Sequence, residues 1–132
     1  MIIETKDTAG RINGFLMPIW NALTKPELRP DQVYMTAIKP GKRKGPHLHM
    51  KREGRFVLLS IEASVLIKDA KNGVYPLMFG EITVVPAGVP CALYNVGKTT
   101  ALVLNMPAPA WSKDDQDDWP VETWSDPEGW DA

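Results

Sequence analysis

The sequence predicts an all-β fold, either a sandwich or a small barrel, and two observations point to it. Twelve prolines and ten glycines interrupt the 132 residues at short intervals. Between these residues lie brief runs rich in Val, Ile, Leu, Phe and Tyr, which is the pattern of short strands bounded by turns. No segment has a long apolar repeat of 3.6 residues with capping residues at its ends, so no long helix is expected.

The expected strands fall into a stronger and a weaker group. The stronger group has the densest apolar and β-branched composition and covers residues 33–38, 55–60, 63–67, 82–85 and 101–105. The weaker group covers residues 14–19, 74–79 and 91–95. Short strands at this spacing, separated by turn residues, are typical of a sandwich or barrel.

The chain length and composition predict one domain with a terminal extension. A chain of 132 residues is long enough for one hydrophobic core. We expect the barrel to occupy residues 1–108 and an acidic, Trp-rich extension to occupy 109–132. Beyond residue 107 the chain holds four of its five tryptophans and eight acidic residues. The extension is expected to pack its indoles over the barrel or a partner subunit; the alternative is that it closes one mouth of the site.

Charge and cysteine content exclude several classes of protein. The net charge of −1 argues against general nucleic-acid binding. A single cysteine, Cys91, excludes an internal disulfide framework and fits a reducing compartment. No secretory signal is visible and no apolar run approaches 18 residues, so we expect a cytoplasmic protein without a membrane span.

The most informative segment lies between Lys39 and Arg55. It holds seven of the fifteen basic residues and both histidines, His47 and His49, with Glu53 four residues after the second. If both histidines lie on one strand, its two-residue period places their rings on the same face. Two imidazoles in a positive field could hold a metal or transfer a proton on an anionic substrate.

Two motifs in this chain resemble those of the cupin superfamily. The first is Pro40-Gly41, five residues, then His47-x-His49-x-x-x-Glu53, and the second has its glycines, proline and asparagine at Gly80, Pro86, Gly88 and Asn95. Together they form a motif core over residues 40–95. The resemblance implies a small antiparallel jelly-roll barrel (a double-stranded β-helix), usually dimeric, with the site inside it.

The chain departs from the cupin pattern at two places. Metal-binding cupins normally have a histidine where this chain has Cys91. The turn glycine expected after the first motif is absent, because Ser60, Ile61 and Glu62 occupy that stretch. Ile61 is unsuited to a positive φ, so we expect a turn of another type or a strained one.

A narrower resemblance covers residues 44–56, 85–95 and 104–107, which are similar to the dTDP-4-dehydrorhamnose 3,5-epimerases and related 4-keto-sugar isomerases. The epimerase base motif is a basic residue, a glycine, a variable residue and a histidine, which implies that His47 is the base. A cationic residue shortly afterwards would match Arg55. The family places a general-acid tyrosine on the late strand, where residues 103–106 contain none. Tyr94 is expected to pack or to make a dimer contact.

A metal site is the main alternative reading of the histidines. His47, His49 and Glu53, with Cys91 as a further ligand, suit Zn, Fe, Mn or Ni. The surrounding lysines and arginines oppose a cation, and a bulge at Gly54 would swing Glu53 outward. We therefore favour no cofactor, and interpret Cys91 as a small buried hydrophobic residue.

The sequence thus predicts a sugar-nucleotide-modifying isomerase or epimerase. His47 and His49 are the expected catalytic pair, and removal of a proton next to the ketone of a dTDP-4-keto-6-deoxy sugar is the expected step. Anionic parts of the substrate are assigned to Lys44, Lys51 and Arg55. A metal-dependent isomerase or dioxygenase and a non-catalytic sugar- or small-molecule-binding barrel remain as alternatives. The expected partners are a small-molecule substrate and a second copy in a homodimer.

Overall fold

The computed structural model describes residues 2–110, 112–119 and 121. Within these residues the chain forms strands and one short 3₁₀ turn, η1 (Pro26–Leu28). The strands are β1 (Ile3–Lys6), β2 (Ile12–Leu16), β3 (Tyr34–Ile38), β4 (Arg43–His47), β5 (Gly54–Leu58), β6 (Val65–Asp69), β7 (Gly73–Pro76), β8 (Thr83–Val85), β9 (Cys91–Asn95) and β10 (Ala101–Asn105). The predicted all-β fold is confirmed.

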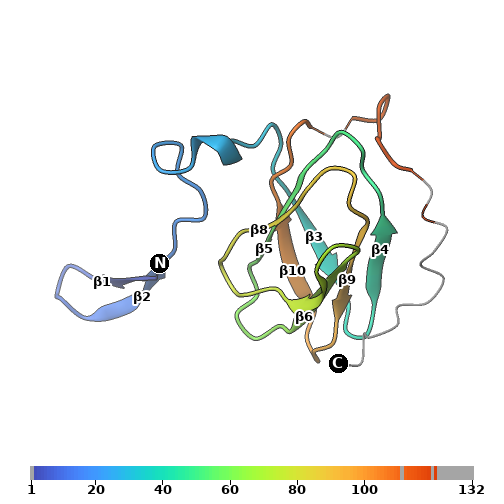
Figure 1. Cartoon of the computed structure of the whole chain (residues 1–132). Coiled ribbons are helices and arrows are strands. Elements are labelled where there is room, and N and C mark those ends of the chain that lie inside the picture. The colour runs from blue at the N-terminus through green and yellow to red at the C-terminus, as the bar shows by residue number, and fades with distance from the viewer. Residues whose placement is uncertain (1, 111, 120, 122–132) are drawn as a thin grey trace.

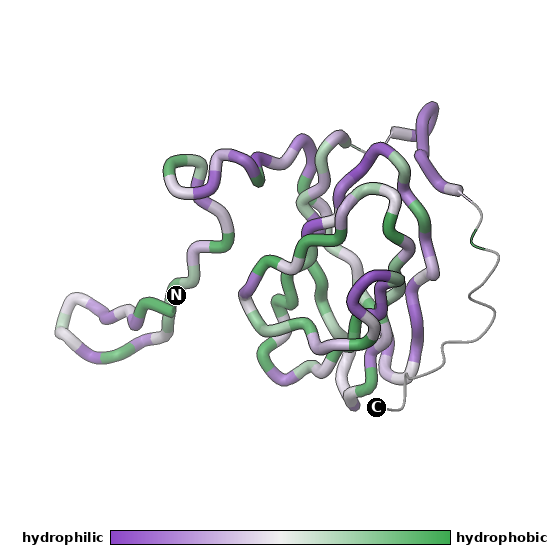
Figure 2. The backbone as a smooth tube through the Cα atoms, viewed as in Figure 1, coloured by the Kyte–Doolittle hydropathy of each residue, from purple (hydrophilic) through white to green (hydrophobic). Residues whose placement is uncertain are grey.

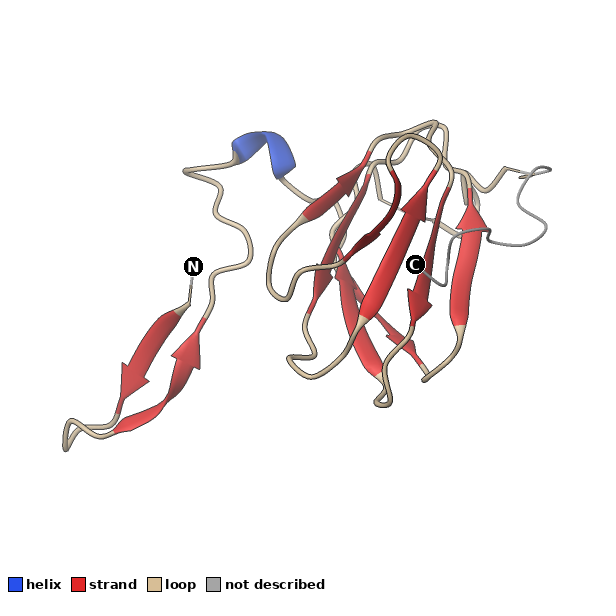
Figure 3. Ribbon diagram, turned by 60° about the horizontal axis from the view of Figure 1, so that its bottom comes forward, coloured by secondary structure: helices blue, strands red, loops and turns tan. Residues whose placement is uncertain are grey.

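Two four-stranded antiparallel sheets form the barrel (Figures 1 and 3). One has the order β3-β10-β5-β8 and the other the order β4-β9-β6-β7. Strands adjacent in a sheet are mostly distant in sequence, since successive strands cross between the two sheets. This is the jelly-roll arrangement that the cupin motifs implied.

Alternating side chains of both sheets meet in one core. Ile38 on β3 and Val103 on β10 are 1% exposed, and Ile67 on β6 is fully buried. Val103 is paired between Thr36 and Leu58, so this row of the sheet contributes to the interior. The period-two pattern of these runs therefore predicts both the strands and their buried faces.

The predicted strands agree with the observed ones to within three residues at their ends. Residues 101–105 and 91–95 match β10 and β9 in full, and residues 33–38 contain β3. The sequence analysis did not predict the N-terminal strand β1 and the histidine strand β4, because neither has an apolar run. β4 also carries an irregularity between Lys44 and His47 in its pairing with β9.

The turn at Ser60–Ala63 resolves the missing glycine of the first cupin motif. The amide of Ala63 donates to the carbonyl of Ser60 at 3.2 Å, which closes an ordinary four-residue turn. Among the described residues only Asp117 combines a side chain with a positive φ, so Ile61 needs no left-handed conformation. The turn is of another type and is not strained.

The β1–β2 hairpin projects away from the barrel (Figures 1 and 3). At its base, the rings of Phe15 and Phe79 make an edge-to-face contact with centroids 6.3 Å apart. The Met17 thioether packs directly against Gly80 and occupies the space that a Cβ atom at position 80 would need. Apolar segments of the hairpin remain uncovered by the rest of the chain (Figure 2).

The described part of the C-terminal extension lies beside the loop that follows β4. Leu48 and Trp119 form an isolated antiparallel bridge, and the Trp119 amide donates to the Leu48 carbonyl at 2.9 Å. Trp119 is 51% exposed. The expectation about Trp111, Trp124 and Trp130 lies outside the described residues. No helix among the described residues is long and apolar enough to cross a membrane.

Candidate functional site

A cavity of about 130 Å³ opens between the sheets at the histidine end of the barrel. Its walls come from β3, β4, β5, β9 and β10, and its lining residues are Tyr34, Thr36, Lys44, His47, His49, Phe56, Cys91, Ala92, Leu93 and Asn105. An outer hollow of about 210 Å³ is lined by Tyr34, His47, His49, Arg52, Gln116 and Asp118. The two hollows share Tyr34 and both histidines, so these three residues stand at the mouth of the site.

The two histidine rings lie side by side, as their spacing predicts. His47 ends β4 opposite Cys91, and His49 follows just beyond the strand. The ring planes are 13° apart and their centroids are separated by 6.0 Å. The expectation that both rings share one face is therefore correct, although only His47 belongs to the strand.

His47 is the more accessible of the pair. Its side chain is 51% exposed, and its Nδ1 lies 3.6 Å from the Asp118 carboxylate. This separation is an ion-pair distance and is too long for a direct hydrogen bond.

His49 is held as a neutral imidazole. Its Nδ1 lies 2.7 Å from the Asp117 carbonyl oxygen, which can only accept, so Nδ1 carries the proton. The Arg52 guanidinium lies 3.1 Å from Nδ1 and 3.4 Å from Nε2. Burial lowers the pKa of His49, the hydrogen bond to Asp117 opposes that effect, and the charge of Arg52 lowers the pKa further.

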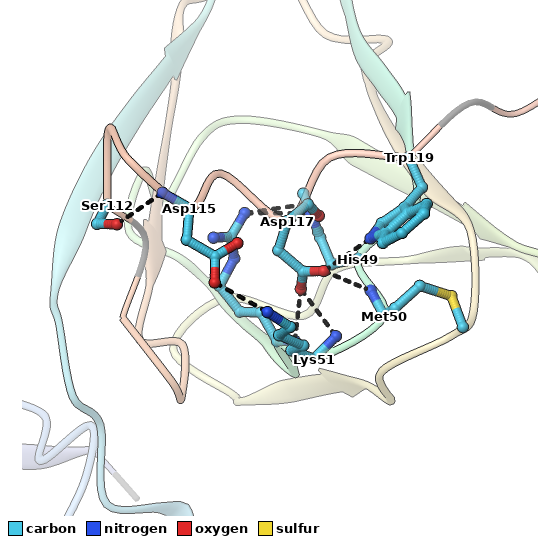
Figure 4. Close-up of polar contacts among 8 residues, drawn as sticks. His49, Met50, Lys51, Ser112, Asp115, Asp117 and Trp119 are labelled. Carbon is cyan, nitrogen blue, oxygen red and sulfur yellow. Dashed lines mark hydrogen bonds and ion pairs between the residues drawn. The ribbon is translucent and has the colours of Figure 1, made fainter.

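Asp117 ties the C-terminal extension to the loop after His49 (Figure 4). Its carboxylate accepts from the amides of Met50, Lys51 and Arg52 at 3.1, 2.8 and 2.9 Å. It also accepts from Trp119 Nε1 at 2.9 Å. Partial desolvation raises the pKa of Asp117, but these four hydrogen bonds outweigh it and lower the pKa to about 2.

Tyr34 is the residue that sequence reasoning could not place. It lines both hollows and is paired with Asn105 across β3 and β10. The Asn105 side-chain amide donates to the Tyr34 hydroxyl at 2.8 Å. A phenol therefore lies on β3, next to the late strand β10. The signal lay in β3, where Tyr34 and Thr36 have the same parity as the core residue Ile38.

The three basic residues that the sequence assigned to substrate binding lie in different places: one in the cavity, one on the surface and one buried away from the cavity. Lys44 lines the cavity. Lys51 is exposed and forms an ion pair with Asp115 at 2.9 Å. Arg55 is 5% exposed and points away from the cavity, bound to the Glu53 carboxylate at 2.8 Å and to the Arg29 carbonyl at 3.0 Å. The cation nearest the histidines is Arg52, which the sequence did not single out.

The residues at the mouth do not fit a divalent metal. Glu53 is engaged by Arg55, so it is not gathered with the histidines. The guanidinium of Arg52 lies against the ring nitrogens of His49. Burial raises the pKa of the Cys91 thiol to about 12, with Asp69 adding to the effect. Within the described residues, no three His, Cys, Asp or Glu side chains converge on one point.

No protein-family model matches the sequence, and no curated protein sequence does. Among solved structures, the chain is similar to a dTDP sugar isomerase from Desulfovibrio desulfuricans G20. The TM-score is 0.65 and the identity 16%, over 93% of this chain and 83% of the isomerase.

Two further structures are similar to the barrel. The capsular polysaccharide assembling protein CapF from Staphylococcus aureus has a TM-score of 0.59 and 19% identity, over 92% of this chain and 34% of CapF. The chain thus spans about a third of the CapF chain. A sugar phosphate isomerase of the cupin superfamily from Silicibacter pomeroyi has a TM-score of 0.51 and 21% identity, over 59% of this chain and 50% of that one. At these identities the likeness establishes the fold alone, and that fold is the cupin fold.

Proposed function

We propose that this protein is an isomerase or epimerase of a nucleotide-linked 4-keto sugar, and that it moves a proton at the carbon next to the ketone. The observation that carries the proposal is the convergence of His47, His49 and Tyr34 on one cavity between the sheets. Such a set contains a base and an acid within a single pocket. Similarity to a dTDP sugar isomerase supports the substrate class.

His47 acts as the base in this proposal. Its half-exposed ring faces the outer hollow, where a sugar ring can approach. When His47 takes the proton from the carbon, the electron pair of the broken C–H bond moves toward the ketone oxygen. Asp118, at 3.6 Å, then stabilises the imidazolium that forms.

Tyr34 acts as the acid that protonates the ketone oxygen. Its hydroxyl accepts from Asn105, which leaves the phenolic hydrogen free to point at the substrate. Arg52, which lines the outer hollow, offsets the negative charge that develops on oxygen. If His47 returns its proton to the former ketone carbon and the hydroxyl on the first carbon loses its proton, the ketone moves and an isomer forms. If Tyr34 takes back its proton from the oxygen and a solvent proton adds to the opposite face of the first carbon, the ketone is restored and an epimer forms; His47 then releases its proton to solvent.

The diphosphate of the substrate is assigned to lysines at the rim. Lys44 lines the cavity, and Lys51 lies on the loop after His49 with a 62% exposed side chain. Lys51 can exchange its exposed ion pair with Asp115 for a phosphate at little cost, since such surface pairs are weak. The role first assigned to Arg55 is better filled by Arg52, because Arg55 is committed to Glu53.

Solvent exchange tests the proposal. The protein is incubated in deuterated water with a dTDP-4-keto-6-deoxyhexose, and deuterium in the recovered sugar is measured by mass spectrometry. We expect incorporation next to the ketone with the wild-type chain and its loss in His47→Ala. Binding of the sugar nucleotide without exchange would overturn the enzymatic role and favour the non-catalytic sugar-binding barrel.

We also propose that the protein works as a homodimer, with the β1–β2 hairpin of each copy laid on the other. Ile12, Phe15 and Leu16 are 65%, 49% and 53% exposed, and a two-stranded hairpin alone is marginally stable in water. The outer face of the β3-β10 sheet carries Met35, which is 56% exposed, and the partly buried Leu104 beside it. Each chain carries both apolar surfaces, the hairpin and the outer sheet face. In a two-fold dimer the hairpin of each copy can therefore cover the sheet face of the other, and the same contact forms twice.

A further inference from the structure

One wall of the outer hollow comes from a segment distant in sequence from the histidines. We call residues 112–119 the strap. Gln116 and Asp118 of the strap line the outer hollow together with Tyr34 and His47. A site built from the barrel strands alone would lack this wall, so the position of the strap decides the shape of the mouth.

Asp117 makes most of the hydrogen bonds that fix the strap, and the Trp119 amide, which donates to the Leu48 carbonyl at 2.9 Å, adds one more. The Asp117 carboxylate accepts from three consecutive backbone amides, those of Met50, Lys51 and Arg52 (Figure 4). Hydrogen bonds to an ionised acceptor are stronger than neutral ones. The other ionic tie, between Lys51 and Asp115, joins side chains that are 62% and 60% exposed and contributes little.

The backbone of Asp117 reaches the same loop as its side chain. Asp117 has φ of +51°, a left-handed conformation that aspartate and asparagine tolerate better than most residues. In this conformation its carbonyl accepts from His49 Nδ1 at 2.7 Å while its carboxylate grips the next three amides. One residue therefore fixes both the strap and the orientation of the His49 ring.

The consequence for His49 is a defined tautomer. A carbonyl partner at Nδ1 keeps the proton there and leaves Nε2 without one. The Arg52 guanidinium lies close to both ring nitrogens, 3.1 Å from Nδ1 and 3.4 Å from Nε2. Without the carbonyl, the proton could sit on either nitrogen. The next residue of the strap, Asp118, is presented to His47 by the same tie.

We propose that Asp117 is a positioning residue, which latches the strap to the loop Met50–Arg52 and thereby completes the mouth of the site and sets the tautomer of His49. The catalytic consequence rests on the proposed isomerase or epimerase function. The latch and the tautomer do not rest on it, and they can be measured without any substrate.

The test compares Asp117→Asn with wild type. Asparagine tolerates the left-handed backbone, so the change removes the charge of the latch and not its conformation. We expect the hydrogen exchange of the Met50, Lys51 and Arg52 amides to accelerate at least tenfold. We expect the ¹⁵N shifts of the His49 ring to move from a single Nδ1–H tautomer to a mixture. With an active substrate, kcat should fall about tenfold while KM changes by less than threefold.

The matched control is Asp114→Asn, the same substitution on the same strap. Asp114 is exposed, and its carboxylate makes no hydrogen bond or ion pair within the described part of the chain. This variant should retain wild-type amide protection, tautomer and turnover. Unchanged protection and an unchanged His49 tautomer in Asp117→Asn would overturn the proposal. If wild type itself turns over no nucleotide sugar, the proposed function fails, and the two substrate-free measurements still decide the latch.

Discussion

At the scale of single residues, the site depends on side chains whose chemistry is set by their neighbours. His47 and His49 are two residues apart, yet one faces solvent beside a carboxylate and the other is half-buried against a guanidinium. Burial and the charge of Arg52 disfavour a charge on His49, which supports the proposed assignment of His47 as the base.

Tyr34 is predicted to be the acid, and removing its hydroxyl tests this role. We expect Tyr34→Phe to lower kcat about 10²-fold, which is the lower end of what general acid catalysis contributes. The ring still fills its place between the sheets, so thermal stability should fall only slightly. Turnover and melting temperature measured on the same preparation separate these effects.

Tyr94→Phe is the matched control for Tyr34→Phe. Tyr94 lies outside the cavity lining, and its ring stacks under the Arg43 guanidinium, 4.7 Å from the centroid. A phenyl ring preserves that contact. Equal turnover in Tyr34→Phe and Tyr94→Phe would show that the Tyr34 hydroxyl transfers no proton.

At the scale of elements, the strand pattern explains which site residues sequence reasoning could find. The period of two placed the rings of His47 and His49 together, because β4 and its extension keep their parity. The same rule failed for Glu53, since the loop Met50–Arg52 lies between it and His49 and breaks the parity. Tyr34 depended on the pairing of β3 with β10, and long-range pairing is not encoded in local periodicity.

The C-terminal extension shows more clearly that contacts between distant segments cannot be predicted from local sequence. Its tryptophans predicted packing over the barrel or a partner subunit. The hydrogen bonds of Asp117 to three amides could not be predicted, because they depend on how both segments are placed in space. Nothing in the local sequence distinguishes Asp117 from Asp114 or Asp115. The cupin motifs therefore predicted the barrel. The alternative that the extension closes one mouth of the site pointed to this segment, but the residues that form the wall came only from the structure.

Arg55 on β5 is predicted to stabilise the fold and to contribute little to substrate binding. Its guanidinium is buried between Glu53 and the carbonyls of Glu27 and Arg29, so it joins the barrel to the segment before β3. Arg55→Met leaves those acceptors without a donor and should lower the free energy of unfolding by about 2 kcal/mol. Urea denaturation measures this, and nucleotide-sugar affinity at low temperature should stay within threefold.

Arg11→Met is the control for Arg55→Met. The Arg11–Asp7 ion pair also joins an arginine to a nearby carboxylate, but the Arg11 side chain is 80% exposed. Its loss should cost less than about 1 kcal/mol. A tenfold loss of nucleotide-sugar affinity in Arg55→Met at unchanged stability would show that Arg55 binds the substrate.

At the scale of the whole molecule, the barrel and the hairpin differ in how far their apolar side chains are buried. The barrel buries a continuous core, with Val57, Ile67 and Ala101 fully buried. The hairpin touches the barrel mainly at Phe15 and Met17, and leaves Ile12 and Leu16 more than half exposed. The hairpin projects away from the barrel (Figure 3), and its exposed apolar side chains, as seen among the described residues, support the proposed cover by a second copy.

The homodimer is predicted to depend on these exposed hairpin residues. A lysine at position 12 or an aspartate at position 16 would place a charge in the interface, where desolvation without a partner is costly. We expect the double variant Ile12→Lys/Leu16→Asp to shift the protein from dimer to monomer in light scattering after size exclusion, while circular dichroism of the barrel stays the same.

Leu23→Lys is the control, because Leu23 is 92% exposed but lies outside the hairpin. It should remain dimeric, since the sites that a partner covers are on the hairpin and the outer sheet face. A wild-type chain that is monomeric at micromolar concentration, or a double variant that stays dimeric, would contradict the exchange of hairpins between copies.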